Sequence, residues 1–387
     1  MNNVAAFLKL QIRRFGPLAF ADFMEHALYF PQSGYYEKED TIGREGDFYT
    51  SVSVGSAFGQ LLAFQFANWM EPPAQRSNQF LEIVEAGSHT GQLAHDILSA
   101  LQQSHPTIYS QTRYWVVEPS EKRSVSQRET LRKFDSVTRW VADLSQLGTQ
   151  DGFSKDGFKI IFSNELLDSM PVHLLRWKSE LQQWVELGVD WVDDQFVWKE
   201  LPGVEEMLPR RVSRRIRSKH LSRAIREMLE PLDAAALMKI IPEGFMLEIP
   251  VAANQWWHDA GTLVGKGKLI AFDYGFGGEV LRPGYPNGTL RGFHRHHPVE
   301  NILNRPGEID ITSHVNFSAL IRTGEKAGFN TEVFTSQELF LGRVAANRIA
   351  AGFRDWDRSE KRQFLTLVHP EHLGTSFKVL IQSKTLP

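Results

Sequence analysis

The chain has 387 residues and no cysteine, which excludes disulfides, thiolate nucleophiles and cysteine-based zinc sites. It also lacks any stretch of about eighteen uninterrupted apolar residues, so no membrane-spanning helix is predicted. No signal-peptide core is present near the start, where residues 5–15 have the pattern of a short amphipathic helix. From these absences we expect a cytoplasmic protein without a membrane partner.

Neither sign of charge is in large excess. The net charge of -3 gives no overall attraction to nucleic acid, so no nucleic-acid partner is expected. One basic run, Arg210–Lys219, could contact nucleic acid or an acidic partner, but no aromatic side chains interleave with it, which favours a solvated face. The length fits one large α/β domain with insertions, or two domains, and a homodimer is an oligomeric state that the sequence leaves open.

The expected elements divide the chain into four parts. Residues 1–75 are predicted to be mostly helical. Residues 76–170 alternate between strand and helix, which is typical of a parallel sheet covered on both faces. Residues 171–245 alternate as an antiparallel ribbon and then become helical, which indicates an inserted subdomain. Residues 246–387 resume the alternation and contain a segment rich in Gly, Pro and His at 276–313, whose length is typical of a functional or a disordered loop. Strands are expected near 80–85, 113–118, 137–141 and 158–163, and again near 268–273, 330–334 and 377–383.

The segment Phe80–Leu98 is the most informative part of the chain. It has the pattern of a buried strand, a turn containing Gly87 and Gly91, and a helix that begins near Thr90. Glycines let a ligand approach the backbone closely, and a helix start presents backbone N–H groups without partners. A second strand ends at Glu118, whose carboxylate can accept hydrogen bonds from both hydroxyls of a ribose. The unit therefore predicts a ribose-bearing cofactor, although a tight structural turn is the alternative.

The charge at the end of the first strand indicates which cofactor. Glu85 would repel a pyrophosphate, and the middle glycine of a dinucleotide motif is missing. These two features argue against a nicotinamide-dependent oxidoreductase. A carboxylate at this position suits the amino group and sulfonium of S-adenosylmethionine (SAM), which is therefore the expected cofactor.

Several short motifs follow one another along the chain. Besides the turn at Glu85, they are Gly46-Asp-Phe-Tyr-Thr-Ser51, Asn164-Glu-Leu-Leu-Asp168, Met170-Pro-Val172, Phe272-Asp-Tyr-Gly275, Gly288-Thr-Leu-Arg291 and Pro306-Gly-Glu-Ile-Asp-Ile-Thr-Ser-His-Val315. In number and order these motifs resemble a known family, the MidA-like SAM-dependent methyltransferases, which includes the mitochondrial complex I assembly arginine methyltransferase. The resemblance extends from about residue 8 to the C-terminus.

The resemblance implies an α/β, class I SAM-methyltransferase (Rossmann-like) fold. Its sheet has seven strands, one of them antiparallel, and it carries an N-terminal helical region and an inserted subdomain. The chain departs from the family at His89, which stands where the family has a glycine, and at Asn316, where an acid is common. The imidazole of His89 could contact the carboxylate of the cofactor or occlude it.

The cofactor is expected across the carboxyl ends of the first strands. Glu85 and Gly87 are assigned to its methionine end and Glu118 to its ribose. Asp143, after the third strand, would reach the adenine amino group or, alternatively, cap a helix. In the resemblance Asp47 and Thr50 close over the cofactor; alternatively, Asp47 terminates a turn.

The segment Asn164-Glu165 follows the fourth strand, beside the expected position of the methyl group. Glu165 and Asp168 are three residues apart, so a turn or short helix would place both carboxylates on one face. Such a pair can hold a guanidinium through bidentate hydrogen bonds and offset its charge. Helix capping by Asn164 and Glu165 is the alternative.

The long loop and its flank carry several histidines, including His294, His296 and His297. No metal is expected, because class I methyl transfer needs none and nearby arginines oppose a divalent ion. Instead, four residues are expected to shape a substrate groove: Arg291, Glu308, Asp310 and His314.

The leading hypothesis is thus a SAM-dependent methyltransferase that acts in-line on arginine in a protein substrate. The alternative is a non-catalytic assembly or scaffold protein that retains the fold, which the substitution at His89 would favour.

Overall fold

The structure of the chain is a computed structural model that describes residues 3–38, 50–76, 80–154, 156–201, 241–278, 284–295 and 297–385. Asp47, His296 and the basic run 210–219 lie outside these residues. The chain divides into two compact units. Unit 1 consists of Met1–Asp47, Asp168–Gln255 and Gly277–Ala319, and unit 2 of Phe48–Leu167, Trp256–Phe276 and Leu320–Pro387.

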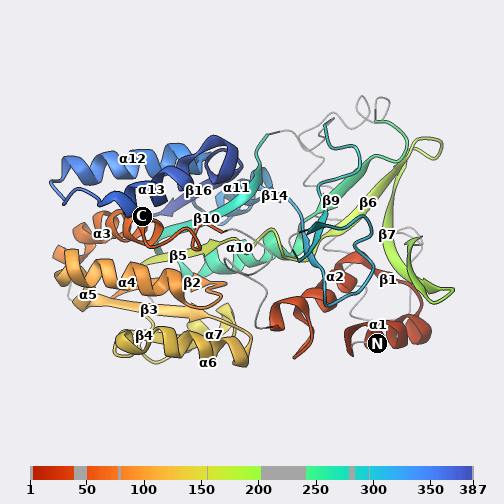
Figure 1. Cartoon of the computed structure of the whole chain (residues 1–387), viewed down its shortest axis with the longest axis horizontal. Helices are drawn as coiled ribbons and strands as arrows, with labels where there is room; N and C mark the ends of the chain where they lie inside the picture. The colour runs from red at the N-terminus through yellow and green to blue at the C-terminus, as the bar shows by residue number, and fades with distance from the viewer. Residues whose placement is uncertain are drawn as a thin grey trace. The chain divides into compact units, whose positions relative to one another are not determined.

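Unit 2 is built on a mixed sheet in which seven strands follow the order β15-β16-β10-β5-β2-β3-β4 (Figure 1). Strand β16 is antiparallel to both of its neighbours, and the pairs from β10 to β4 are parallel. This arrangement confirms the predicted seven-stranded sheet with one antiparallel strand. The strands are β2 (Leu81–Ala86), β3 (Thr112–Val117), β4 (Thr138–Val141), β5 (Phe158–Asn164), β10 (Lys266–Phe276), β15 (Asn330–Ser336) and β16 (Phe377–Lys384).

The parallel strands are mostly apolar because helices bury both faces of the sheet. All six residues of β2 are buried, and so are the last six residues of β5, which include Ile160, Ile161 and Phe162. The helices and turns of this part are α3 (Ala57–Arg76), α4 (Gln92–Ser104), α5 (Pro106–Gln111), α6 (Glu121–Thr130), η2 (Arg132–Phe134), α7 (Leu144–Leu147), α12 (Gln337–Ala350), α13 (Arg358–Val368) and η3 (Pro370–Gly374). Helices α10 (Val251–Leu263) and α11 (Phe317–Lys326) each begin in unit 1 and continue into unit 2.

Helix α3 fills one side of this core with aromatic side chains. The ring of Phe58 packs edge-on against Phe272 of β10 at 5.5 Å, and Phe66 packs against Phe162 of β5 at 5.4 Å. All four side chains are fully buried. Fully burying a phenylalanine contributes about 2 kcal/mol, so these contacts tie α3 firmly to the sheet.

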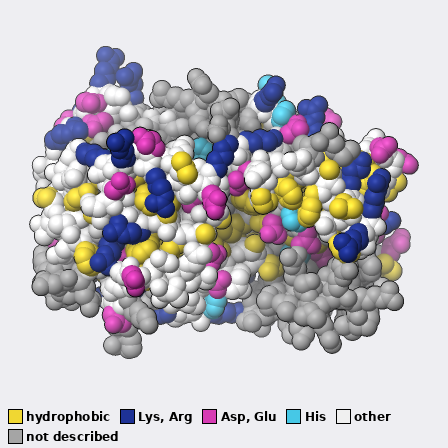
Figure 2. All heavy atoms as spheres, turned by 90° about the horizontal axis from the view of Figure 1, so that it is seen from below, with side chains coloured by type: hydrophobic (Ala, Val, Ile, Leu, Met, Phe, Trp, Pro, Cys, Tyr) yellow, Lys and Arg dark blue, Asp and Glu magenta, His cyan; other side chains and the backbone are white. Residues whose placement is uncertain are grey.

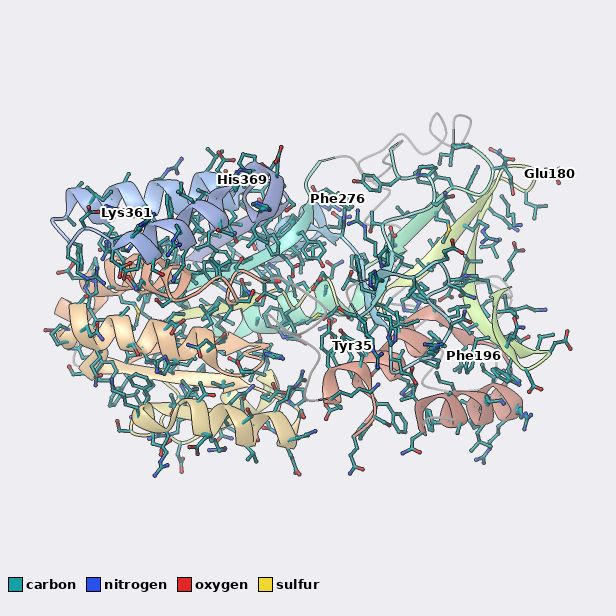
Figure 3. All side chains as sticks on the ribbon, in the orientation of Figure 1. Tyr35, Glu180, Phe196, Phe276, Lys361 and His369 are labelled. Atoms are coloured by element: carbon teal, nitrogen blue, oxygen red, sulfur yellow. The ribbon has the colours of Figure 1, made fainter. Side chains whose placement is uncertain are left out.

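The described residues of unit 1 form two antiparallel sheets. Its helices α1 (Asn3–Phe15) and α2 (Phe20–Tyr29) bury residues at helical spacing, such as Val4 and Leu8, against Leu187 of β7. Tyr35 and Phe196, labelled in Figure 3, belong to the same core. The other elements are η1 (Tyr35–Glu37), β1 (Leu18–Ala19), β6 (His173–Lys178), β7 (Gln183–Val192), β8 (Gln195–Glu200), β9 (Met246–Ile249), β11 (Arg291–His294), β12 (His297–Pro298), β13 (Asp310–Thr312) and β14 (Val315–Asn316).

The structure differs from the sequence-based expectation in three respects. The expected helical region 1–75 does not stay together, because α1 and α2 pack on β7 in unit 1 whereas α3 packs on α4 in unit 2. The loop 276–313 is not structureless, since β11 pairs with both β12 and β13. Helices α12 and α13 were not predicted; they cover part of the core beside β15 and β16.

The surface gives no sign of one dominant charge on the face drawn in Figure 2, where Lys and Arg side chains are interspersed with Asp and Glu. No helix in the described part of the chain is long and apolar enough to cross a membrane.

The start of α13 is stabilised by a carboxylate, that of Glu360, which accepts several hydrogen bonds. The two terminal nitrogens of Arg354 donate to the two oxygens of Glu360 at 2.8 and 2.6 Å, and Gln60 of α3 donates to Oε1 at 3.0 Å. Glu360 and Asp357 also form a reciprocal capping box. Because the hydrogen bonds from Arg354 favour the charged form, the pKa of Glu360 falls from 4.5 to about 2. Lys361, labelled in Figure 3, pairs with Asp355 at 2.6 Å beside this network.

We predict that Glu360→Gln destabilises the protein near neutral pH by about 1 kcal/mol, since it removes charge-assisted hydrogen bonds at a helix start. The depressed pKa means that the ionised carboxylate stabilises the fold above about pH 4.5 and loses this effect as the pH falls toward about 2. Denaturant unfolding at several pH values should therefore show a difference from the unaltered protein that shrinks in acid. Glu129→Gln, which removes an exposed pair with Arg132 at 3.7 Å, should change little at any pH. A pH-independent difference for Glu360→Gln would contradict this explanation.

Candidate active site

The parallel register brings several polar residues to one edge of the sheet in unit 2. Ala86 of β2 is paired with Val117 of β3 and with Ser163 of β5. The residues that follow these three are Gly87, Glu118 and Asn164, which therefore lie at the same level along the strands, with Asn164 as the last residue of β5. Carboxyl ends of parallel strands are where open α/β sheets bind ligands.

Glu85 is a buried carboxylate at this edge, with only 2% of its surface exposed. Its Oε2 accepts a hydrogen bond from the hydroxyl of Tyr114 at 2.6 Å. Burial raises the pKa of Glu85 from 4.5 to about 7, against the opposing effect of the bond from Tyr114. A carboxyl group whose pKa lies near 7 can lose its proton readily when a cation binds beside it.

The turn after β2 adopts the backbone that its glycines predict. Gly87 and Gly91 have φ values of 77° and 82°, and His89 between them is also left-handed at 47°. Gly87 is exposed, and a Cβ there would lie 3.1 Å from Leu166. Burial, reinforced by the charge of Arg123, lowers the pKa of His89 to about 4, so its imidazole is neutral near pH 7.

Glu118 is already held by three protein groups. Its Oε1 accepts hydrogen bonds from the Ser120 backbone N–H at 2.9 Å and from Arg123 at 3.1 Å. Its Oε2 accepts one from Gln127 at 2.8 Å, and 2% of its side chain is exposed. A carboxylate oxygen has two acceptor directions. Within the described residues, Oε2 thus keeps one acceptor direction, which leaves room for a hydrogen bond from one ribose hydroxyl and not from both, as we expected.

Two residues assigned to the cofactor have local roles. Asp143 is exposed and caps α7, since its Oδ1 accepts a hydrogen bond from the Ser145 N–H at 2.8 Å. Thr50 forms a reciprocal turn with Ser53, whose N–H donates to its Oγ1 at 3.1 Å. Of the two explanations for Asp143, helix capping is thus the one that the structure displays.

The segment after β5 places Glu165 in a strained turn rather than in a helix. Glu165 has a φ of 52°, and the described residues 165–168 form bends and a turn. Its Oε1 accepts hydrogen bonds from the Ser51 N–H at 3.0 Å and from Asn164 Nδ2 at 3.1 Å. Asn164 Oδ1 is buried and has no hydrogen-bond partner within the described residues. The alternative of helix capping by Asn164 and Glu165 is therefore wrong.

Asp273 holds this turn in place from the end of β10. Its fully buried side chain accepts hydrogen bonds from the backbone N–H groups of Leu166 and Leu167 at 3.2 and 2.9 Å. The N–H of Glu165 donates to the Phe272 carbonyl at 2.9 Å. The turn that carries Glu165 thus depends on a neighbouring strand.

Asp168 belongs to unit 1 and lies near two tyrosines there. Its carbonyl accepts a hydrogen bond from the Ser313 N–H at 2.9 Å. The hydroxyl of Tyr36 donates to Asp310 at 2.8 Å, and its ring stacks on Tyr29 at 5.5 Å. Burial and then the charge of Asp310 raise the pKa of Tyr36 well above its ordinary value, with a smaller effect from Asp168.

The residues assigned to a substrate groove gather around the small sheet of unit 1. Arg291 and Asp310 lie on the paired strands β11 and β13; Arg291 is exposed and Asp310 is buried. The carbonyl of Glu308 is 2.8 Å from Nδ1 of His294, and the N–H of His314 donates to Thr289 at 2.9 Å. In the described part of the chain, no three His, Asp or Glu side chains form a group that could hold a metal ion.

Sequence reasoning missed Arg123 and Gln127, which contact Glu118 from α6. A signal was present, because the two residues are four apart on the helix that follows Glu118 and so lie on one face. The rest of α6 is strongly polar, and Gln127 is its single buried residue.

Comparisons with known proteins show which family the chain is similar to. Residues 61–335 match the model of a family described as "Putative S-adenosyl-L-methionine-dependent methyltransferase". The mitochondrial protein arginine methyltransferase NDUFAF7 of Mus musculus is 28% identical over 404 residues, covering 96% of this chain and 82% of the relative. The mitochondrial NDUFAF7 homolog of Drosophila melanogaster is 25% identical over 399 residues, covering 98% and 84%.

Two crystal structures from Burkholderia thailandensis resemble the whole chain. A candidate methyltransferase bound to S-adenosylhomocysteine has 25% identity and a TM-score of 0.77, covering 99% of this chain and 92% of the other. A native structure of an uncharacterized protein from the same superfamily has 26% identity and a TM-score of 0.76, with the same coverage. One of our expectations is contradicted: the curated relatives are mitochondrial proteins, so a cytoplasmic location is not supported.

We predict that Asp273→Ala lowers the free energy of unfolding by about 2 kcal/mol or more, because it leaves the N–H groups of Leu166 and Leu167 without their acceptor. Chemical denaturation measures this change. Asp143→Ala is the matched control, since it also removes an acceptor of a backbone N–H but at an exposed position, and should cost about 1 kcal/mol or less. Equal losses in the two variants would show that Asp273 does not support the turn as described.

Proposed function

Because the chain belongs to a family of SAM-dependent methyltransferases, we propose that it transfers the methyl group of SAM to an arginine side chain of a protein. SAM-dependent methyl transfer is the activity of this chain and SAM is its cofactor. The comparisons do not favour a non-catalytic scaffold. The arginine acceptor is the proposed part, and it is supported by the curated relatives, which are named protein arginine methyltransferases.

The residues at the edge of the sheet fit a cationic cofactor. Glu85 contributes a buried carboxylate at the end of β2, and Asn164 contributes a buried amide oxygen without a partner in the described residues. The two strands are neighbours in register, so both acceptors lie at one edge. Gly87 is exposed and adds no side chain between them. Two acceptors in a buried setting suit the amino group of SAM and would repel a phosphate.

When bound, SAM supplies an electrophilic methyl group on a positively charged sulfur. The residues of this chain bind and orient it. In the proposal Glu85, with Gly87 and Gly91 in the turn, holds the methionine end, and Glu118 accepts a ribose hydroxyl on its remaining Oε2 direction. Asp143, Asp47 and Thr50 remain predicted cofactor contacts; Asp143 would have to serve while it caps α7.

Glu165 is the residue proposed to orient the arginine. Its carboxylate follows β5 and is fixed by donors from Ser51 and Asn164. A fixed carboxylate can hold a guanidinium in one plane, which positions a nitrogen for in-line attack and offsets its positive charge. The left-handed backbone at Glu165 costs about 1 kcal/mol or more, and such strain is typical of functional sites. This strained, anchored carboxylate is the observation that carries the proposal.

The other assignments from the sequence stand as proposals. Asn164 and Asp168 are assigned to catalysis beside Glu165. Arg291, Glu308, Asp310 and His314, in unit 1, are assigned to the protein substrate. Support for this group is that these four residues lie on or beside β11 and β13.

We predict that Glu165→Gln lowers methyl transfer about 100-fold, since a neutral amide cannot offset the guanidinium charge. SAM binding should stay within about twofold, because Glu165 is not assigned to the cofactor. The measurement is incorporation of labelled methyl groups from SAM into arginine-containing proteins, followed by amino-acid analysis for methylarginine.

Glu121→Gln, at an exposed position on α6, serves as the control and should leave the rate unchanged. Unchanged methyl transfer by Glu165→Gln would refute its role. Label recovered on an amino acid other than arginine would refute the proposed acceptor.

We also predict that SAM binding releases a proton. Glu85 has a pKa of about 7 without ligand, so it is mostly protonated below that pH. The cationic amino group of SAM favours the ionised carboxylate, so affinity should weaken as the pH falls below about 7. Calorimetry in buffers of different ionisation enthalpy measures the released proton directly. Glu85→Gln should bind more weakly and lose the pH dependence, and a pH-independent affinity of the unaltered protein would argue against this role.

A further inference from the structure

Gln127 joins three segments around the cofactor edge of unit 2. It is fully buried on α6. Its Nε2 donates to the backbone carbonyl of His89 at 3.0 Å and to Glu118 Oε2 at 2.8 Å. Its Oε1 accepts a hydrogen bond from Trp140 Nε1 of β4 at 3.1 Å. One side chain thus links the turn after β2, the end of β3 and strand β4.

These bonds leave the amide no other orientation. A carbonyl and a carboxylate can only accept, and the indole N–H can only donate. Turning the amide over would place its oxygen against two acceptors and its NH₂ against a donor. Because the side chain is buried, water is not available to replace the lost bonds. The position of Gln127 therefore fixes the distance between the His89 carbonyl and the Glu118 carboxylate.

The hydrogen bond from Gln127 to Glu118 also determines where the remaining acceptor direction of this carboxylate points. Ser120 and Arg123 occupy the acceptor directions of Oε1, so the remaining direction belongs to Oε2, the oxygen that Gln127 holds. The carbonyl of His89 belongs to the turn after β2, in which His89 stands where the family has a glycine. A shift of Gln127 would move both the turn and the oxygen.

We propose that Gln127 is a positioning residue for SAM. It holds the turn at His89 and Oε2 of Glu118 at the separation that the methionine and ribose ends of the cofactor require. This inference rests on the proposed roles of the turn and of Glu118. Gln127 itself acts through these groups and does not need to touch the cofactor.

The chain offers a matched control in Gln382 of β16. Gln382 is also fully buried, and its Oε1 also accepts a hydrogen bond from a tryptophan, Trp257, at 2.8 Å. Its Nε2 donates to the Ile321 carbonyl at 3.0 Å and to the Thr331 hydroxyl at 2.9 Å. It pairs with Leu269 near the start of β10, the end of that strand opposite to Asp273. The two glutamines thus have equivalent bonds at opposite ends of the sheet.

The test compares Gln127→Met with Gln382→Met in the full chain. Methionine keeps the length of the side chain and removes all three hydrogen bonds, so both variants should lose similar thermal stability. Calorimetric titration with SAM should show about tenfold weaker binding for Gln127→Met and unchanged binding for Gln382→Met. Equal affinities in all three proteins would overturn the inference, as would an equal loss in both variants. Absence of SAM binding by the unaltered protein would instead overturn the cofactor site itself.

A second variant keeps the shape of the side chain in case Gln127→Met does not fold. In Gln127→Glu a carboxylate faces Glu118 and the His89 carbonyl, so its ionised form repels both. Protonation restores one donor, and the ratio of its SAM dissociation constant to that of the unaltered protein should fall toward one as the pH is lowered. Taking the ratio removes the contribution of Glu85, which both proteins share. A ratio that does not change with pH would overturn the inference.

Discussion

The parallel register of β3, β2, β5 and β10 is the constraint on which the rest of the site depends. Parallel strands align their carboxyl ends, and burial on both faces permits little slippage because a shift of one residue would reverse every side chain. The residues that directly follow the paired positions therefore lie at the same level along the strands: Gly87, Glu118 and Asn164. Asp273 extends this edge on β10. The chemistry of the site is thus a consequence of how the sheet is packed.

The carboxylates at this edge differ in the hydrogen-bond donors that bind them. Asp273 and Glu118 each accept two or more hydrogen bonds from nearby groups of the protein. Glu85 has the Tyr114 hydroxyl as its principal donor, and burial raises its pKa to about 7. A cation bound beside Glu85 would favour its ionised form. This difference explains why Glu85 is suited to the cationic end of SAM.

The two turns that leave β2 and β5 each contain a non-glycine residue with a strained backbone. His89 and Glu165 are both left-handed without being glycine, and both turns are held by contacts from a neighbouring element. Gln127 binds the carbonyl in the first turn, and Asp273 binds the N–H groups that follow in the second. A turn that would otherwise relax is held rigid, which keeps its functional groups in place for a ligand.

The sequence by itself determined the sheet, because apolar strand patterns such as that of β2 and β5 do not depend on distant contacts. It also determined the residues at the strand ends, since Glu85, Glu118 and Asn164 follow directly from where each strand stops. Only the tertiary structure decided which groups form hydrogen bonds with those residues. The bond from Ser51 to Glu165 joins segments that are far apart in the sequence, and no local pattern specifies it. The spacing of Arg123 and Gln127 on α6 was a signal that they share one face, but only the packing of α6 shows that this face binds Glu118. Likewise, the sequence left open whether a turn or a short helix follows Asn164. The structure has a turn, whose N–H groups at Leu166 and Leu167 are bound by Asp273, more than a hundred residues away in sequence.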